Sequence, residues 1–221
     1  MLVAKRTFKP AKLPPGRRKI KCRWVFSVKY TSNGLIDKFK ARLVAKGCSQ
    51  TYGIEYLDSY SPTIRMDSLR ALLAIAAANN WPLRQVDVIS AYLAGHLDEE
   101  VYMEPPEGLD MPLGTTLRLL KALYGLKQSG RVWYHRIQEF LESQGLYRTD
   151  SDWCVFVNTE RTLFVGVYVD DLVITGPSLS AINSLIAAIA VAFLVKDLGE
   201  IDFCLRLHVV RDDKAKTLTV D

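Results

Sequence analysis

Two adjacent carboxylates, Asp170 and Asp171, interrupt a stretch of β-branched and apolar residues over 163–175. The residues on either side predict two strands joined at this pair. Two like charges a few ångströms apart raise each other's pKa unless a cation neutralises them. A divalent metal site is therefore one interpretation, and a solvated hairpin turn, in which Asp is common, is the other.

A third carboxylate, Asp87, lies near the end of a separate predicted strand over residues 83–88. If that strand lies beside the Asp170–Asp171 hairpin, the three carboxylates fit two divalent ions about 4 Å apart, either Mg²⁺ or Mn²⁺. One ion would lower the pKa of an attacking hydroxyl, and the other would stabilise the leaving oxygen of an in-line displacement. This predicts phosphoryl or nucleotidyl transfer. A metal-dependent phosphohydrolase would use the same carboxylates, but no motif in the sequence favours one.

Positive charge is concentrated at one end of the chain. Residues 1–46 carry fourteen Lys or Arg and one acidic residue, Asp37, whereas the whole chain has a net charge of only +5. Such a block suits a polyanion, because clustered cations release counterions from a phosphate backbone. A solvated tail followed by an ordinary charged hairpin is the alternative interpretation.

Composition excludes several classes of protein. The 221 residues are 49% hydrophobic and 24% charged, as in ordinary globular domains. The longest apolar run, over residues 185–195, is too short for a membrane-spanning helix, which needs about 20 residues. No secretory leader is visible at the N-terminus, so we expect a cytoplasmic or nuclear protein. The four Cys and three His are too scattered for a zinc site or a disulfide framework.

Strands and helices are mixed without regular alternation, which predicts an α+β fold with a mainly antiparallel sheet backed by helices. Residues 1–19 are rich in Pro, Lys and Arg and predict a linker or arm. The predicted elements are a hairpin over 23–46, a helix over 69–78, a strand over 83–88, a short helical turn over 90–94, a strand over 101–103, a helix over 131–144, strands over 153–157, 163–169 and 172–175, a helix from 178 or 180 to 195, and a hairpin over 209–220.

A series of motifs follows in a fixed order: KARLVAKG at 40–47, VDVISAYLAG at 86–95, VYMEPPEG at 101–108, LYGLKQSGRVWY at 123–134, YVDD at 168–171 and KDLG at 196–199. Together they resemble the reverse transcriptase of copia-type LTR retrotransposons over roughly residues 20–221.

The resemblance implies a right-hand polymerase fold with fingers and palm. It implies fingers over 20–82 and 99–130 and palm over 83–98 and 131–221, the palm ending in a primer-grip-like hairpin, with 1–19 as a basic flexible arm. The chain stops at Asp221, so we expect no thumb or RNase H domain within it. The implied partners are an RNA or DNA template with primer, dNTPs, and other Pol domains such as integrase and RNase H, without a membrane.

The resemblance also implies roles for individual residues. Asp87, Asp170 and Asp171 match the catalytic, metal-binding carboxylates, and the backbone carbonyl of Val88 matches a further metal ligand. The positions that match nucleotide-binding residues are Lys40, Arg42, Lys46, Tyr92 and Gln128, and those that match primer or template contacts are Tyr168, Arg131, Leu205 and Arg206. Lys40, Arg42 and Lys46 can share one face of a strand, because side chains alternate. Tyr92 would exclude a ribose 2′-hydroxyl or simply pack in the core, and Trp133 is expected in the core.

The sequence departs from the family at the presumed primer grip. A glycine of the family's Phe-Leu-Gly motif is replaced by Arg206. This departure, together with the missing thumb, keeps open an alternative function, that of a truncated and inactive relic that only binds nucleic acid or a partner protein.

Overall fold

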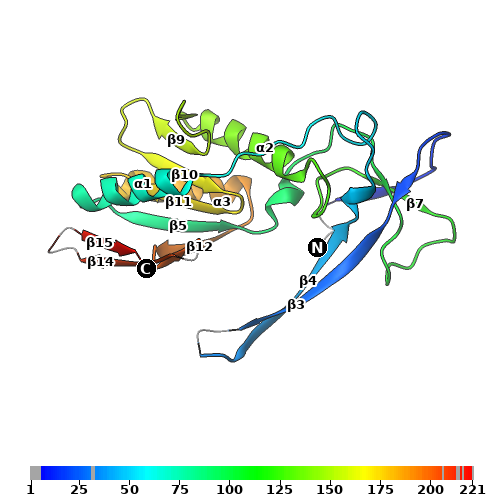
Figure 1. Cartoon of the computed structure of the whole chain (residues 1–221), viewed down its shortest axis with the longest axis horizontal. Coiled ribbons are helices and arrows are strands. Elements are labelled where there is room, and N and C mark those ends of the chain that lie inside the picture. Colours follow the sequence, from blue (N-terminus) through cyan, green and yellow to red (C-terminus); the bar gives the residue numbers. More distant parts are fainter. Residues whose placement is uncertain (1–5, 31–32, 206, 213–214, 216, 221) are drawn as a thin grey trace. The chain divides into compact units, whose positions relative to one another are not determined.

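The computed structural model describes residues 6–30, 33–205, 207–212, 215 and 217–220. The chain divides into two compact units, each built from two stretches of sequence. Unit 1 comprises residues 1–60 and 92–133, and unit 2 comprises residues 61–91 and 134–221; Figure 1 shows the elements of both. No helix in the described residues has both the length and the hydropathy needed to span a bilayer.

Unit 1 contains a four-stranded sheet in the order β1-β7-β6-β2. The strands are β1 (Phe8–Ala11), β2 (Lys19–Ile20), β6 (Tyr102–Met103) and β7 (Thr116–Leu119). β7 pairs antiparallel with both β1 and β6, and β2 pairs parallel with β6. The buried apolar core of this unit consists of Ile20, Leu43, Ala45, Leu93, Val101, Met103, Leu117, Leu119, Leu123 and Leu126.

The predicted hairpin over 23–46 is confirmed. Strand β3 (Cys22–Tyr30) pairs antiparallel with β4 (Ile36–Ala45), and the 3-10 turn η1 (Gly47–Ser49) follows. The register places Phe26 opposite Ala41 and Ser27 opposite Lys40. Because side chains alternate along a strand, Lys40 and Arg42, two positions apart on β4, lie together on one face of the hairpin.

The prediction of a flexible arm over residues 1–19 is wrong for its described part. β1 pairs with β7, and the carbonyl of the fully buried Thr7 accepts a hydrogen bond from the Leu120 amide at 2.9 Å. β1 is an edge strand, so the missing N–H of Pro10 is tolerated. Its partner is distant in sequence, which is why local composition did not reveal the strand.

Unit 2 contains a six-stranded, entirely antiparallel sheet in the order β12-β5-β11-β10-β9-β8. The predicted α+β class with a mainly antiparallel sheet is thus confirmed. The strands are β5 (Leu83–Val88), β8 (Leu146–Arg148), β9 (Val155–Asn158), β10 (Phe164–Tyr168), β11 (Asp171–Thr175) and β12 (Val195–Glu200).

Two helices of unit 2, α1 (Met66–Ala78) and α3 (Leu179–Ala192), cover opposite faces of the sheet. A Cβ added to Gly166 of β10 would meet the side chains of Ile64 and Leu72 at 2.9 Å, so α1 covers the face that Gly166 shares with Asp87. Arg84 points to the other face and donates to Asn183 Oδ1 of α3 at 3.3 Å. The sheet therefore has a helix on each of its two faces (Figure 1).

The remaining elements are two helical segments that pass from one unit to the other and a small C-terminal sheet. The turn η2 (Ala91–Ala94) and the helix α2 (Ser129–Ser143) each begin in one unit and end in the other. A three-stranded sheet of β13 (Phe203–Cys204), β14 (Leu207–Asp212) and β15 (Thr217–Val220) confirms the predicted hairpin over 209–220. It is tied to the end of α1, because Arg211 donates to the Trp81 carbonyl at 2.6 Å.

The boundaries of the units differ from the predicted domain boundaries. The helix α1 was expected with residues 20–82 but belongs to unit 2, because it packs on the sheet at Gly166. Residues 92–98 and 131–133 were expected with the later part of the chain but belong to unit 1.

Candidate active site

The three carboxylates singled out in the sequence lie at one end of the unit 2 sheet. The register of β11 against β5 places Asp171 opposite Asp87. Asp170 lies in the turn between β10 and β11, and its carbonyl accepts a hydrogen bond from the Val88 amide at 2.7 Å. The structure therefore brings together residues that are more than eighty positions apart in the sequence.

Electrostatic coupling confirms that these side chains are close. Burial raises the pKa of Asp171 above its ordinary value, and the charges of Asp170 and Asp87 raise it further. Gln85 Nε2 donates to Asp171 Oδ1 at 3.1 Å, and this bond partly offsets the rise in the pKa. Gln85 thus offsets the rise in the pKa of Asp171 only in part, and a cation beside Asp171 would lower that pKa.

Cys204 is a neighbour of this cluster that the sequence did not suggest. Its side chain is buried, and burial together with the charge of Asp171 raises the pKa of the thiol to about 11. The thiol is therefore neutral at physiological pH. No spacing pattern links Cys204 to the carboxylates, because β13 reaches them only through the fold.

The turn that carries Asp170 is strained. Val169 has a φ of 52°, a conformation that is rare for a β-branched residue. A two-residue turn needs a positive φ to match the twist of its strands, and most such turns use Gly, Asn or Asp. Strain of this kind costs about 1–3 kcal/mol and persists because the pairing of Tyr168 with Asp171 fixes the turn.

The side chains do not form a complete metal site. Within the described residues, no three His, Cys, Asp or Glu side chains stand in an arrangement that would hold a metal ion. The donor chemistry nevertheless fits: the carboxylates of Asp87, Asp170 and Asp171 offer the oxygen ligands that Mg²⁺ and Mn²⁺ prefer. Val88 ends β5, and its amide donates a hydrogen bond to the Asp170 carbonyl.

Three further candidates belong to unit 2. Tyr168 ends β10 and is 39% exposed. Leu205 is half-buried and has a φ of 51°, so the turn after β13 adopts a left-handed conformation without a glycine. Arg206 lies outside the described residues.

Unit 1 brings together two of the predicted nucleotide-binding residues. Tyr92 packs edge-on against Tyr124, with ring centroids 4.7 Å apart, and the Arg42 guanidinium lies 5.6 Å from the centre of the Tyr124 ring. All three side chains are half-buried. Tyr124 was recognised only as part of a motif, and its role as the bridge between Arg42 and Tyr92 required the fold.

Lys40 and Lys46 differ from each other in their placement. Lys40 is half-buried and shares a face of β4 with Arg42. Lys46 lies beyond the last residue of β4 and is exposed. The strand alternation that allowed the three cations to share a face therefore applies to Lys40 and Arg42 only.

Gln128 is 1% exposed, and its side-chain amide is used inside unit 1. Its Nε2 donates to the Glu55 carbonyl at 2.8 Å, and its Oε1 accepts from Gln50 Nε2 at 3.0 Å. Arg131 pairs with Asp58 at 3.0 Å. Gln128 thus fixes the loop that carries it, and Trp133, 2% exposed, lies in the core as predicted.

A close approach of two backbone segments holds this part of unit 1. The Ala45 amide donates to the Tyr124 carbonyl at 2.8 Å, and a Cβ added to Gly125 would lie 2.1 Å from the Ala45 carbonyl oxygen. A Cβ on Gly47 would lie 2.0 Å from the Gly125 oxygen. The motif therefore uses glycine for the close approach of its backbone to β4 and to the residues that follow it.

Comparison with known protein families identifies the family of this chain. The model of the family described as "Reverse transcriptase (RNA-dependent DNA polymerase)" matches residues 5–220. The chain belongs to the reverse transcriptase family. The likeness to copia-type retrotransposons predicted from the motifs is confirmed by the relatives described next.

The curated relatives are retrotransposon polyproteins. The chain is 37% identical over 217 residues to the retrovirus-related Pol polyprotein from transposon TNT 1-94 of Nicotiana tabacum, covering 96% of this chain and 16% of the relative. It is 39% identical over 195 residues to that from transposon RE1 of Arabidopsis thaliana, covering 86% of this chain and 13% of the relative. The chain thus spans about a sixth or less of these relatives.

The chain also matches the solved structure of a foamy viral protease-reverse transcriptase in complex with double-stranded DNA. The TM-score is 0.45 at 11% sequence identity, with 88% of this chain and 28% of that chain covered.

Proposed function

We propose that the chain catalyses template-directed DNA synthesis, transferring a nucleotide from a dNTP to a primer 3′-hydroxyl on an RNA or DNA template. The observation that supports the proposal most strongly is the pairing of Asp171 with Asp87 beside Asp170. Burial, together with the charges of Asp170 and Asp87, raises the pKa of Asp171, and such a group of carboxylates gains from bound cations. Membership of the reverse transcriptase family supports the same reaction.

In this proposal Asp87, Asp170 and Asp171, with the Val88 carbonyl, bind two Mg²⁺ or Mn²⁺ ions. Such ions lower the pKa of the attacking hydroxyl and stabilise charge on the leaving oxygen. The sheet of unit 2 then serves as the palm, and its strand pairing holds the carboxylates before the ions arrive. The hydrogen bond from Val88 to Asp170 orients the turn relative to β5.

Unit 1 then serves as the fingers and binds the nucleotide. Arg42 and Lys40, on one face of β4, would neutralise charge on the triphosphate. Tyr92, held by Tyr124, would lie under the sugar and exclude a ribose 2′-hydroxyl. Gln128 keeps a positioning role, because its side chain holds the loop next to Glu55.

Primer and template contacts are proposed for the exposed Tyr168, for Leu205 and Arg206 in the turn after β13, and for Arg131. In the intact element we propose integrase and RNase H domains as partners, in keeping with the polyprotein names of the relatives.

Primer extension tests the proposal. The chain is incubated with poly(rA)/oligo(dT), labelled dTTP and Mg²⁺, beside the variant Asp170→Asn/Asp171→Asn and the exposed control Asp150→Asn. We expect extension by the wild type and the control, and a loss of about 1000-fold in the double variant. Equal signal in all three proteins would refute the role of the carboxylates. Binding of the duplex without extension by the wild type would favour a relic that does no chemistry.

A further inference from the structure

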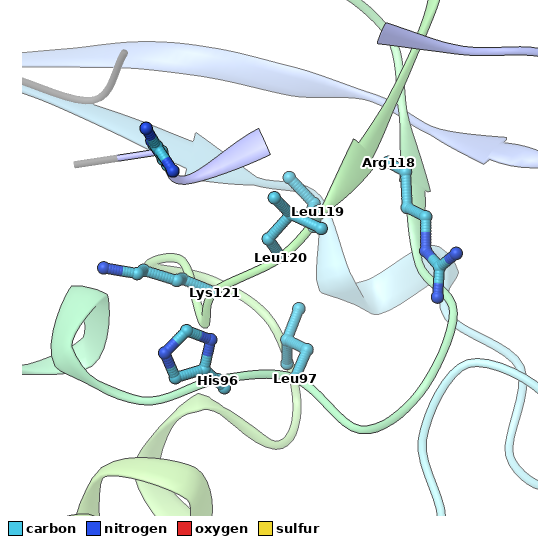
Figure 2. Close-up of a pocket in the computed structure, with 7 residues that line it drawn as sticks. His96, Leu97, Arg118, Leu119, Leu120 and Lys121 are labelled. Carbon is cyan, nitrogen blue, oxygen red and sulfur yellow. The ribbon is translucent and has the colours of Figure 1, made fainter. Parts of the chain in front are cut away.

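A basic cavity of about 530 Å³ lies within unit 1, apart from every residue assigned to the reaction above. Arg6, His96, Arg118 and Lys121 line it together with three leucines, and Figure 2 shows these side chains. Among the described residues that line it, none is acidic. No sequence motif points to this cluster, because its members come from three separate stretches of the chain.

Backbone pairing sets two of these side chains next to each other. His96 and Lys121 form an isolated antiparallel bridge, with the Leu97 amide donating to the Leu120 carbonyl at 3.1 Å and the Ala122 amide donating to the Gly95 carbonyl at 2.9 Å. In this pattern His96 and Lys121 are a non-hydrogen-bonded pair, the arrangement in which opposed side chains lie closest. Figure 2 shows the His96 ring and the Lys121 side chain on the same side of the bridge.

The N-terminal segment brings Arg6 to the same cavity. The Thr7 carbonyl accepts hydrogen bonds from the amides of Leu120 and Lys121, at 2.9 and 3.3 Å. Arg6, the residue before Thr7, is thereby held beside Lys121 and has a φ of 48°, which is uncommon for a residue other than glycine. Three segments therefore converge so that their basic side chains border one cavity.

The charges around the cavity are compensated at one position only. Arg118 pairs with Glu100 at 3.1 Å. No ion pair in the described part of the chain neutralises Arg6 or Lys121. Neighbouring like charges repel each other, and a bound anion would remove that repulsion.

The chemistry of the lining identifies the class of ligand. Arginine and lysine are the side chains that bind phosphate in proteins. The volume lies within the range of about 300–1,000 Å³ that is typical of sites for organic ligands. The leucines supply apolar surface for a sugar or the edge of a base. A phosphate that is part of a nucleotide chain fits this combination better than a bare inorganic ion does.

We propose that this cavity binds a phosphate group of a single-stranded polynucleotide, with Arg6 and Lys121 as the phosphate contacts and His96 as an additional donor. Only the choice of a polynucleotide over a free polyphosphate rests on the proposed function. The cavity is thus a second nucleic-acid contact, separate from the carboxylate cluster.

The test compares two variants that each remove two positive charges. Arg6→Gln/Lys121→Gln alters the cavity, and Arg70→Gln/Arg161→Gln alters exposed positions of unit 2. Binding of a fluorescein-labelled 20-nucleotide single strand is followed by anisotropy between 50 and 300 mM NaCl. Because the slope of log K against log salt is about −0.7 per neutralised phosphate and the cavity holds one phosphate, the cavity variant should lose about 0.7 of slope and about 5-fold in affinity at 0.1 M salt.

Competition with sodium tripolyphosphate distinguishes the source of the phosphate. The polynucleotide site is supported if the slope of log K against log salt for the 20-nucleotide strand falls in the cavity variant but not in the unit 2 variant. An unchanged slope with lost tripolyphosphate binding assigns the cavity to free polyphosphates and overturns the polynucleotide. Equal behaviour of the two variants overturns the site altogether.

A second measurement needs no charge-removing variant, in case the cavity variant unfolds. In the wild type, the ring proton resonances of His96 should shift on addition of the strand, and those of His135 and His208 should not. Absence of a selective His96 shift contradicts the proposal. Primer extension by both variants, measured in parallel, separates a failure of this site from a failure of the proposed polymerase.

Discussion

Gly125 is the position at which a single methyl group should disturb unit 1 most. Its φ of +89° is one that L side chains rarely adopt, and its Cβ would lie 2.1 Å from the Ala45 oxygen. The conformational penalty is about 1–2 kcal/mol. Relief of the contact requires a shift that breaks the Ala45–Tyr124 hydrogen bond and strains the packing, for about 2–3 kcal/mol more. Gly125→Ala should therefore cost about 3–5 kcal/mol.

Gly108 provides the matched control in the same unit. Its φ is +79°, and a Cβ there would meet nothing within 4 Å, so Gly108→Ala should cost only the conformational penalty of about 1–2 kcal/mol. Urea unfolding followed by tryptophan fluorescence measures both variants. A difference of about 2–3 kcal/mol between them is expected. Equal losses of stability would refute the close approach of β4 to the loop at Gly125.

Four further predictions concern other parts of the molecule. Asp171 has a raised pKa, so its stabilising contribution is present at low pH and is lost as pH rises from 3.8 through the raised value. Asp171→Asn should therefore raise the free energy of unfolding at pH 7 relative to the wild type. A lower free energy of unfolding would contradict a raised pKa. Burial alone would raise the pKa of Asp197, but hydrogen bonds from the Gly199 amide and Arg84 lower it. Asp197→Asn should therefore cost about 0.5–1 kcal/mol near pH 7 and less as pH falls below 3.8, as urea midpoints at both pH values would show. Phe156 is fully buried, so Phe156→Ala should lower stability by about 3–5 kcal/mol in the same assay, and a loss below 1 kcal/mol would place it outside the core. Tyr92→Ala should admit ribonucleotides in primer extension, whereas unaltered selectivity would leave Tyr92 with a packing role only.

The sequence predicted the elements whose signals are local. The strand β5 matches its predicted bounds of 83–88, because valines alternate with polar residues over 85–88 and Pro82 precedes the strand. The carboxylates alone left open whether the strand that carries Asp87 lies beside the Asp170–Asp171 hairpin, and the resemblance to reverse transcriptases implied that it does. The register of β5 and β11 places Asp87 opposite Asp171.

Elements defined by distant partners could not be predicted in the same way. β12 was expected to begin as the end of a helix, but it pairs with β5 over residues 195–200. β1 contains Pro10 and three further residues whose pairing with β7 is invisible in the local composition. Gln128 was expected to face a nucleotide, yet its amide is satisfied by Gln50 and Glu55, which lie far away in the sequence.

Iron-directed cleavage tests the central claim, that Asp87, Asp170 and Asp171 form one divalent metal site. Fe²⁺ replaces Mg²⁺, and ascorbate with peroxide then generates hydroxyl radicals that cut the backbone next to the bound ion. The structure predicts cuts around residues 86–88 and 169–171 in the wild type, and their loss in Asp170→Asn/Asp171→Asn but not in Asp150→Asn. Cleavage confined to one of the two segments, or cleavage that persists in the double variant, would contradict the claim.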